Sequence, residues 1–185
     1  KADPAPEKRI LVFTTTFHPI SGPAEDALCE LMRKMPDVHF DIITAAHTKE
    51  ALDIPCIVAN GTVHRVGFGT RFDKFLLPFV GIRKALRLAN KHTYLFSWSI
   101  MASYGTLPAL ILRKGKLIPL LVTLADQDLS WYERLFLRLI LSHTDQVYTS
   151  TSEQGQKLIS LEKRMRARKS LGAGDSFANQ IRFAY

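Results

Sequence analysis

Apolar and polar positions at the start of the chain alternate between two short apolar runs and one amphipathic stretch. Residues 9–14 (Arg-Ile-Leu-Val-Phe-Thr) form a near-continuous apolar run, which is typical of a strand buried on both faces of a parallel sheet. Residues 24–35 carry apolar side chains at helical spacing, with acidic residues early and basic residues late, and Pro36 ends the helix. Residues 38–44 form a second apolar run. This opening predicts a β-α-β unit, in which the helix turns one face to the sheet through Ala27, Leu28, Leu31 and Met35.

The same alternation continues less regularly along the rest of the chain. Short strands are expected at 56–58 and 62–66, before a long helical segment at 72–89 that Pro78 and Gly81 are expected to kink or split. Strands that alternate with helices at this spacing predict an α/β fold, a Rossmann-like open and mostly parallel sheet with helices on both faces. The remaining expected elements are strands at 94–96, 117–123 and 146–149, and helices at about 103–113, 131–142 and 152–168.

Length and composition fit one globular domain. The chain has 185 residues, 46% of them hydrophobic and 23% charged, which is ordinary for a folded domain. We expect a flexible tail at 1–8, a Rossmann-like domain at 9–170, and a linker or the start of a further domain at the Gly-rich 171–185. No apolar run approaches the roughly 20 residues of a membrane span, so no bilayer crossing is expected. Cys29 and Cys56 are the only cysteines, which argues against a zinc cluster or a disulfide framework and favours a reduced, cytoplasmic setting.

The charge balance points to an anionic partner. Lys and Arg number 25 against 17 Asp and Glu, a net charge of +8, which suits nucleic acid, anionic lipid headgroups or a phosphorylated substrate, or serves solubility alone. The basic run at 163–169 fits a solvated helix face better than nucleic-acid binding. The segment 71–88 is amphipathic, basic and aromatic, which suits an anionic membrane surface and equally a helix packed on the sheet. Its candidate membrane residues are Arg71, Lys74, Phe75, Arg83, Lys84 and Arg87.

Ligands of open α/β sheets bind at the carboxyl ends of the strands, which directs attention to the loop at 15–25. Gly22 lets the backbone approach a ligand there, and the following helix N-terminus favours a phosphate. Neither G-x-G-x-x-G nor G-K-[ST] occurs, which argues against a nicotinamide-dependent dehydrogenase and a P-loop enzyme. His18 is placed to contact a phosphate or an acceptor hydroxyl, or is incidental. Trp98 and Tyr104 lie where an aromatic ring stacks on a sugar, although such rings also fill cores.

Three stretches resemble glycosyltransferase family 4. Residues 10–25 are similar to the opening strand, aromatic-x-Pro turn and helix-opening Glu of that family, although the family's second glycine is replaced by Ser21 or Pro23. Residues 118–129 resemble its I-P-hydrophobic-T-hydrophobic-H-x-x-D segment, with Ala125 at the histidine position. Residues 135–153 resemble its helix, A-D-x-V and serine pattern. The matching residues of the first stretch are Phe17, Pro19, Gly22 and Glu25.

The resemblance implies one half of a GT-B architecture, in which two Rossmann-like domains face a cleft and the C-terminal one holds the nucleotide-sugar. This chain would be the N-terminal, acceptor-side domain of a retaining glycosyltransferase, inactive alone and without a metal or a cofactor beyond the nucleotide-diphosphate sugar. The implied acceptor is a glycan or a lipid-linked sugar, at the cytoplasmic face of the membrane. The alternative is a non-catalytic acceptor- or membrane-binding subunit that needs a separate donor-binding chain.

The resemblance also suggests roles for individual residues. Alanine cannot supply the histidine's polar contact near the transferred sugar, so Asp126 is the candidate catalytic residue and Asp128 a candidate acceptor contact. Both aspartates equally fit a turn or helix cap ahead of Trp131. The loop expected to contact the donor phosphate or the acceptor comprises His18, Ser21, Gly22 and Glu25, and the residues expected to bind the acceptor are Trp98, Tyr104, Asp128 and Ser150.

Overall fold

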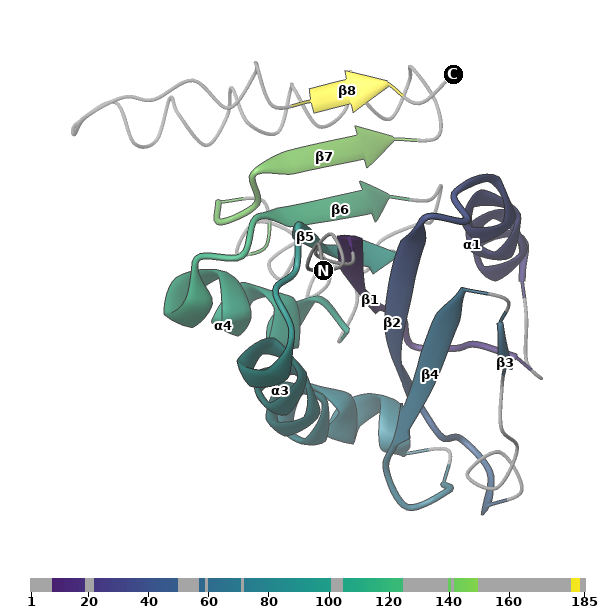
Figure 1. Ribbon diagram of the computed structural model, residues 1–185. Helices are drawn as coiled ribbons and strands as arrows, with labels where there is room; N and C mark the ends of the chain where they lie inside the picture. Colours follow the sequence, from purple (N-terminus) through teal and green to yellow (C-terminus); the bar gives the residue numbers. More distant parts are fainter. Residues whose placement is uncertain are drawn as a thin grey trace, which may run out of the picture.

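The computed structural model places eight strands in one open sheet with the order β3-β4-β2-β1-β5-β6-β7-β8 (Figure 1). The residues that it describes are 8–18, 22–49, 57–58, 60–70, 72–100, 105–124, 140, 142–149 and 181–183. All neighbouring strands are parallel except β3, which runs antiparallel to β4. The strands are β1 (Lys8–Phe13), β2 (Val38–Ala45), β3 (Ile57–Val58), β4 (Gly61–Val66), β5 (Phe96–Ile100), β6 (Leu120–Leu124), β7 (Gln146–Thr149) and β8 (Ile181–Phe183).

Helices cover both faces of this sheet. They are α1 (Pro23–Lys34), α3 (Asp73–Lys91) and α4 (Thr106–Lys116) in the described part of the chain. Because side chains of a strand alternate between its faces, Val12 of β1 packs in a core with Leu28 of α1, whereas Leu11 packs in a second core with Leu77 of α3 and Leu112 of α4. The predicted Rossmann-like, mostly parallel sheet with helices on both faces is confirmed.

The first β-α-β unit forms as predicted, but its helix presents a partly different face to the sheet. The buried residues of α1 are Glu25, Leu28 and Met32, and Ala27 is exposed. The predicted face is confirmed at Leu28 and Met35, which pack in the core, and is wrong at Ala27. The hydrophobic spacing left out Glu25, whose carboxylate is buried through hydrogen bonds to the loop that precedes the helix.

The long helix α3 is continuous, so of the predicted kink or split at Pro78 and Gly81 the split is wrong, and the kink stays a prediction. Both residues are buried on the face that packs against the sheet and α4. A Cβ added at Gly81 would lie 3.4 Å from Pro108 of α4 and 3.7 Å from Ile43 of β2. Both distances are ordinary van der Waals contacts, so Gly81 packs against its neighbours, and this tertiary packing stabilises a segment that local propensity disfavours.

Strand β5 lies further along the chain than predicted. Tyr94 precedes the strand, and the expected strand at 94–96 overlaps it only at Phe96. Serines at 97 and 99 made this segment look like the end of a strand, but both are fully buried with partners: Ser97 Oγ donates to the Pro119 carbonyl, and the Ser99 hydroxyl pairs with that of Thr106.

The later part of the chain is described only in pieces. Strand β7 has the predicted bounds, whereas β8 was not predicted. The expected helices at 131–142 and 152–168 lie outside the described residues, apart from 140 and 142. Among the helices that are described, none combines the length and apolar character needed to span a membrane.

Candidate functional site

The sheet changes its direction of growth at β1, which places a candidate site at the carboxyl ends of β1 and β5. Strand β2 pairs with one side of β1 and β5 with the other, an arrangement that forms the ligand-binding crevice of open α/β sheets. The loop at 14–18 begins at this point. The N-terminus of α4 is close by, because a Cβ added at Gly105 would lie 3.6 Å from the backbone carbonyl carbon of Thr14.

The loop at 14–18 is held in place largely by Glu25 of α1. Thr16 Oγ1 donates to Glu25 Oε1 at 2.6 Å, and the backbone N–H of Gly22 donates to Oε2 at 2.9 Å. Thr14 is fixed by its N–H, which donates to the Ile43 carbonyl at 3.1 Å. Glu25 is buried, with both oxygens engaged. Through these contacts, Glu25 holds the loop at 14–18 against the start of α1.

Two side chains from neighbouring strands brace the same loop. Arg65 of β4 donates from Nη2 to the His18 carbonyl at 2.7 Å. His47, two residues beyond the end of β2, contacts the Thr15 carbonyl through Nε2 at 2.7 Å. Because a carbonyl only accepts, Nε2 carries the proton. The backbone of His47 is in the left-handed region, with φ 57°, a conformation that is uncommon outside glycine and often marks functional loops.

The electrostatics of this edge favour an anionic group. The N-termini of α1 and α4 both lie beside the loop, and helix N-termini carry partial positive charge with unpaired N–H groups. Arg65 adds a full positive charge beside His18, whose side chain is exposed. The oxygens of Glu25, at the N-terminus of α1, are already engaged by Thr16 and by the Gly22 N–H. The site is therefore suited to a phosphate or a sugar hydroxyl. Arg65 and His47 were not singled out from the sequence, because they lie on or after other strands.

The adjoining loop at 67–70 is fixed by Asp73, the first residue of α3. Asp73 is fully buried and accepts hydrogen bonds from the N–H of Gly69 at 2.8 Å and from the N–H and hydroxyl of Thr70 at 3.1 and 2.8 Å. Burial alone would raise the pKa of Asp73, but these hydrogen bonds hold it below its ordinary value. Gly67, with φ 126°, leaves no room for a Cβ beside this carboxylate.

A strand at 94–96 would end before Trp98, but Trp98 lies inside β5. Its indole N–H donates to Thr123 Oγ1 of β6 at 2.8 Å, and its ring packs partly buried against the core on the α1 side of the sheet. Its role in acceptor binding stays a prediction. The other predicted site residues, Ser21, Tyr104, Asp126, Asp128 and Ser150, lie outside the described residues, as does Arg71.

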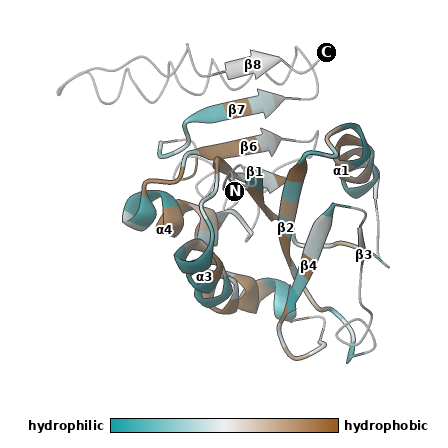
Figure 2. Ribbon diagram, in the orientation of Figure 1, coloured by the Kyte–Doolittle hydropathy of each residue, from teal (hydrophilic) through white to brown (hydrophobic). Residues whose placement is uncertain are grey.

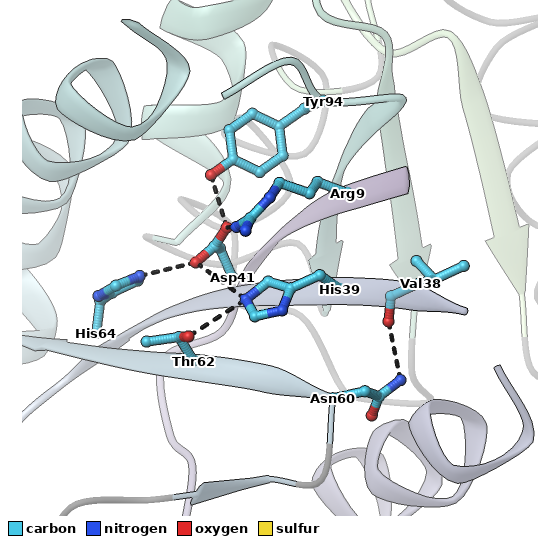
Figure 3. A network of polar contacts seen from close by, with 8 residues as sticks. All are labelled: Arg9, Val38, His39, Asp41, Asn60, Thr62, His64 and Tyr94. Atoms are coloured by element: carbon cyan, nitrogen blue, oxygen red, sulfur yellow. Dashed lines mark hydrogen bonds and ion pairs between the residues drawn. The ribbon is translucent and has the colours of Figure 1, made fainter. Parts of the chain in front are cut away.

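A second polar cluster lies toward the amino ends of the strands and was not anticipated (Figure 3). Its centre is Asp41 of β2, almost fully buried, which accepts hydrogen bonds from Arg9 Nη1 at 2.9 Å, the Tyr94 hydroxyl at 2.8 Å and His64 Nε2 at 3.0 Å. His39 Nε2 lies 3.8 Å from the same carboxylate. The sequence signal that could have revealed this cluster is the charge of Asp41 inside an apolar strand, because buried carboxylates are rarely unpaired.

The contacts set the protonation of this cluster. Burial by itself would raise the pKa of Asp41, but hydrogen bonds from His64 and Tyr94 and the nearby imidazoles lower it to about 2. Burial and the neighbouring carboxylate raise the pKa of Tyr94. Asp41 therefore stays ionised and Tyr94 stays protonated at neutral pH. The contacts of the cluster link β1, β2, β4 and the segment that follows α3. The role of the cluster is therefore structural.

Comparisons with known proteins identify the fold. No family model matches the chain, and no curated protein is similar to it in sequence. Among solved structures, sucrose-phosphate synthase from Thermosynechococcus elongatus aligns over 95% of this chain and 47% of its own, with a TM-score of 0.63 and 13% identity. A protein described as a UDP-N-acetylglucosamine 2-epimerase from Listeria monocytogenes aligns over 96% of this chain and 44% of its own, with a TM-score of 0.55 and 14% identity.

This chain spans slightly less than half the length of both structures. Both have the GT-B architecture, and the chain has the fold of one Rossmann-like half of it. The expected GT-B half is thus confirmed as a fold.

Proposed function

We propose that this chain is the acceptor-side domain of a glycosyltransferase, which transfers a sugar from a nucleotide-sugar held by a second Rossmann-like domain. The observation that carries the proposal is the braced loop at 14–18, set between two helix N-termini at the switch point of a GT-B-like half. Parallel α/β sheets bind ligands at this position. Both similar structures are named for sugar compounds, which agrees with a sugar ligand.

The roles of the residues follow from their positions. Glu25, Arg65 and His47 hold the loop, so that the exposed His18 ring faces a phosphate or a hydroxyl of the ligand. In the reaction, the oxygen of the acceptor hydroxyl bonds to the anomeric carbon, the bond from that carbon to the diphosphate breaks, and the hydroxyl proton passes to the oxygen of the departing nucleoside diphosphate. Asp126 supplies the polar contact near the transferred sugar. The remaining proposed acceptor contacts are Trp98, Tyr104, Asp128 and Ser150.

The proposed reaction retains the anomeric configuration and needs no metal or further cofactor. The acceptor is a glycan or a lipid-linked sugar at the cytoplasmic face of the membrane. The donor-binding residues belong to the second domain, so the 185 residues are expected to be inactive on their own.

Turnover tests the proposal directly. The chain, alone and joined to or mixed with a donor-binding Rossmann-like domain, is incubated with a panel of nucleotide-sugars and alkyl glycoside acceptors, and release of nucleoside diphosphate is measured. We expect release only with both domains present, and a loss of at least 100-fold in kcat for Asp126→Asn. Turnover by the chain alone, or epimerisation of the donor sugar without an acceptor, would contradict the proposal.

Binding by the chain itself gives a second test. A glycosyl phosphate titrated into the isotopically labelled chain is expected to shift amide resonances of residues 14–18, Gly22 and His47. Amides around Asp41 serve as the internal control, because they lie toward the other edge of the sheet. Shifts confined to the Asp41 cluster would place the ligand elsewhere.

A further inference from the structure

Four phenylalanine side chains stand in solvent around the first turns of α3. Phe72 and Phe79 are each 72% exposed, Phe68 of the preceding loop 69%, and Phe75 45%. Positions 72, 75 and 79 are three and four residues apart, so they lie on one face of the helix. Together the rings expose on the order of 400 Å² of aromatic surface, an area at which exposed apolar patches are commonly functional.

The same face becomes cationic further along the helix. Arg83 and Arg87 follow Phe79 at intervals of four residues, and both are exposed. The stripe is therefore aromatic in the earlier turns and basic in the later ones. Figure 2, which colours every residue of the helix and not the stripe alone, shows apolar residues in the turns that follow the hydrophilic start of α3 and hydrophilic residues toward its end.

The stripe offers no acidic group to a partner. Asp73 is the one acidic residue among residues 73–91, and it is fully buried with its oxygens bonded to Gly69 and Thr70. Lys74 Nζ lies 5.0 Å from the centre of the Phe75 ring, which adds a cation beside the aromatic end. The basic residues of the helix are Lys74, Arg83, Lys84, Arg87 and Lys91.

We propose that this stripe, formed by Phe68, Phe72, Phe75, Phe79, Arg83 and Arg87, docks the protein on an anionic phospholipid bilayer. The phenylalanine rings enter the boundary between headgroups and acyl chains, and the guanidinium groups contact headgroup phosphates. Because the rings occupy one end of the stripe, the N-terminal end of α3 lies deeper than its C-terminal end. The N-terminal end of α3 adjoins the loop at 67–70, beside the carboxyl edge of the sheet.

The order of residues favours a bilayer over single-stranded nucleic acid. Nucleic-acid grooves combine stacking rings with cations that track the phosphates along the whole strand. Here the rings and the arginines are separated along the helix, which matches an interface with an apolar layer beneath an anionic one. Docking requires no sugar transfer, so the failure of either proposal leaves the other standing.

Co-sedimentation of the 185-residue chain with vesicles tests the docking. Phosphatidylcholine vesicles with 30 mol% phosphatidylglycerol are compared with pure phosphatidylcholine at 50 and 500 mM NaCl. We expect the chain to bind the anionic vesicles at low salt. Its affinity should be at least tenfold weaker for neutral vesicles, and at least tenfold weaker for anionic vesicles at high salt. The paired variants Phe72→Ser/Phe79→Ser and Arg83→Glu/Arg87→Glu are each expected to weaken binding at least tenfold.

Leu117→Asn is the matched control. It removes an exposed apolar side chain, 84% accessible, at the C-terminus of α4, and asparagine suits the left-handed backbone there. This variant is expected to bind as the wild type does, and circular dichroism checks that all variants fold. Equal binding by wild type and both paired variants would overturn the proposal. Two other results would also overturn it. One is a dimer in sedimentation velocity that depends on the stripe, and the other is a complex with an oligonucleotide that depends on it, in each case while vesicle binding does not depend on the stripe.

Discussion

The Tyr94 hydroxyl donates a hydrogen bond to Asp41 Oδ2 at 2.8 Å, and both residues are buried. This bond joins the chain after α3 to the interior of β2, 53 residues away in sequence. Tyr94→Phe leaves the carboxylate with one donor fewer and is expected to lower the free energy of unfolding by about 1–3 kcal/mol. Urea denaturation measures the change. Tyr148→Phe is the control: its hydroxyl contact with Gln146 is long, at 3.4 Å, and a change near zero is expected.

The pH dependence of stability follows from the lowered pKa of Asp41. Its pKa is about 2 in the folded protein against 3.8 for the unfolded reference. A carboxyl with a depressed folded pKa contributes stability above its unfolded pKa and loses it as pH falls through its folded pKa. About 2 kcal/mol should therefore be lost between pH 5 and pH 2. The gap in unfolding free energy between wild type and Asp41→Asn should narrow by this amount, and a gap independent of pH would refute the assignment.

The local pattern of apolar and polar residues was sufficient to predict the elements in which that pattern follows burial alone. The bounds of β1, α1, β2 and β7 follow from apolar runs and helical spacing to within about two residues. The same pattern failed at β5, where the buried serines at 97 and 99 find partners only in the folded protein. It also allowed a split at Pro78 that does not occur, because a helix interior tolerates a proline when packing on the sheet outweighs the lost hydrogen bond.

The candidate site was predictable in place but not in detail. A loop at the end of the first strand of a parallel sheet must lie at the carboxyl edge, so His18, Gly22 and Glu25 could be placed near that edge from the sequence, and their roles in binding stay a prediction. Arg65 and His47 were missed because their contacts with this loop span 47 and 32 residues. Such partners depend on strand order, which periodicity does not reveal.

Two glycines should respond to alanine with opposite signs. At Gly67, φ is 126° and a Cβ would overlap the Asp73 carboxylate, so Gly67→Ala is expected to lower stability by more than about 2 kcal/mol. Gly115, in the last turns of α4, has nothing within 4 Å of the added carbon. Gly115→Ala should raise stability by about 0.5–1 kcal/mol through helix propensity. Thermal denaturation of both variants checks the pair, and equal shifts would contradict the geometry.

Leu117 ends α4 in a left-handed conformation, with φ 56°. Glycine adopts this conformation without steric cost, so Leu117→Gly is expected to raise the free energy of unfolding by about 0.5–1 kcal/mol. The same replacement at Ile111, a half-exposed position inside α4, should lower it by about 1 kcal/mol or more. A destabilising effect at both positions in chemical denaturation would show that Leu117 is not strained.

Glu25 links the stability of the loop at 14–18 to the proposed function, and its removal should affect both. Glu25→Ala takes away the acceptor of Thr16 Oγ1 and of the Gly22 N–H, so two hydrogen bonds at the start of α1 are lost. We expect a loss of about 2 kcal/mol in stability and at least tenfold weaker binding of a glycosyl phosphate. Glu30→Ala is the control on the same helix, because Glu30 is exposed and pairs only on the surface with Lys34. It should leave ligand binding unchanged, since such pairs contribute little. Calorimetric titration of both variants distinguishes the outcomes: unchanged affinity in Glu25→Ala would mean that the ligand does not contact this loop.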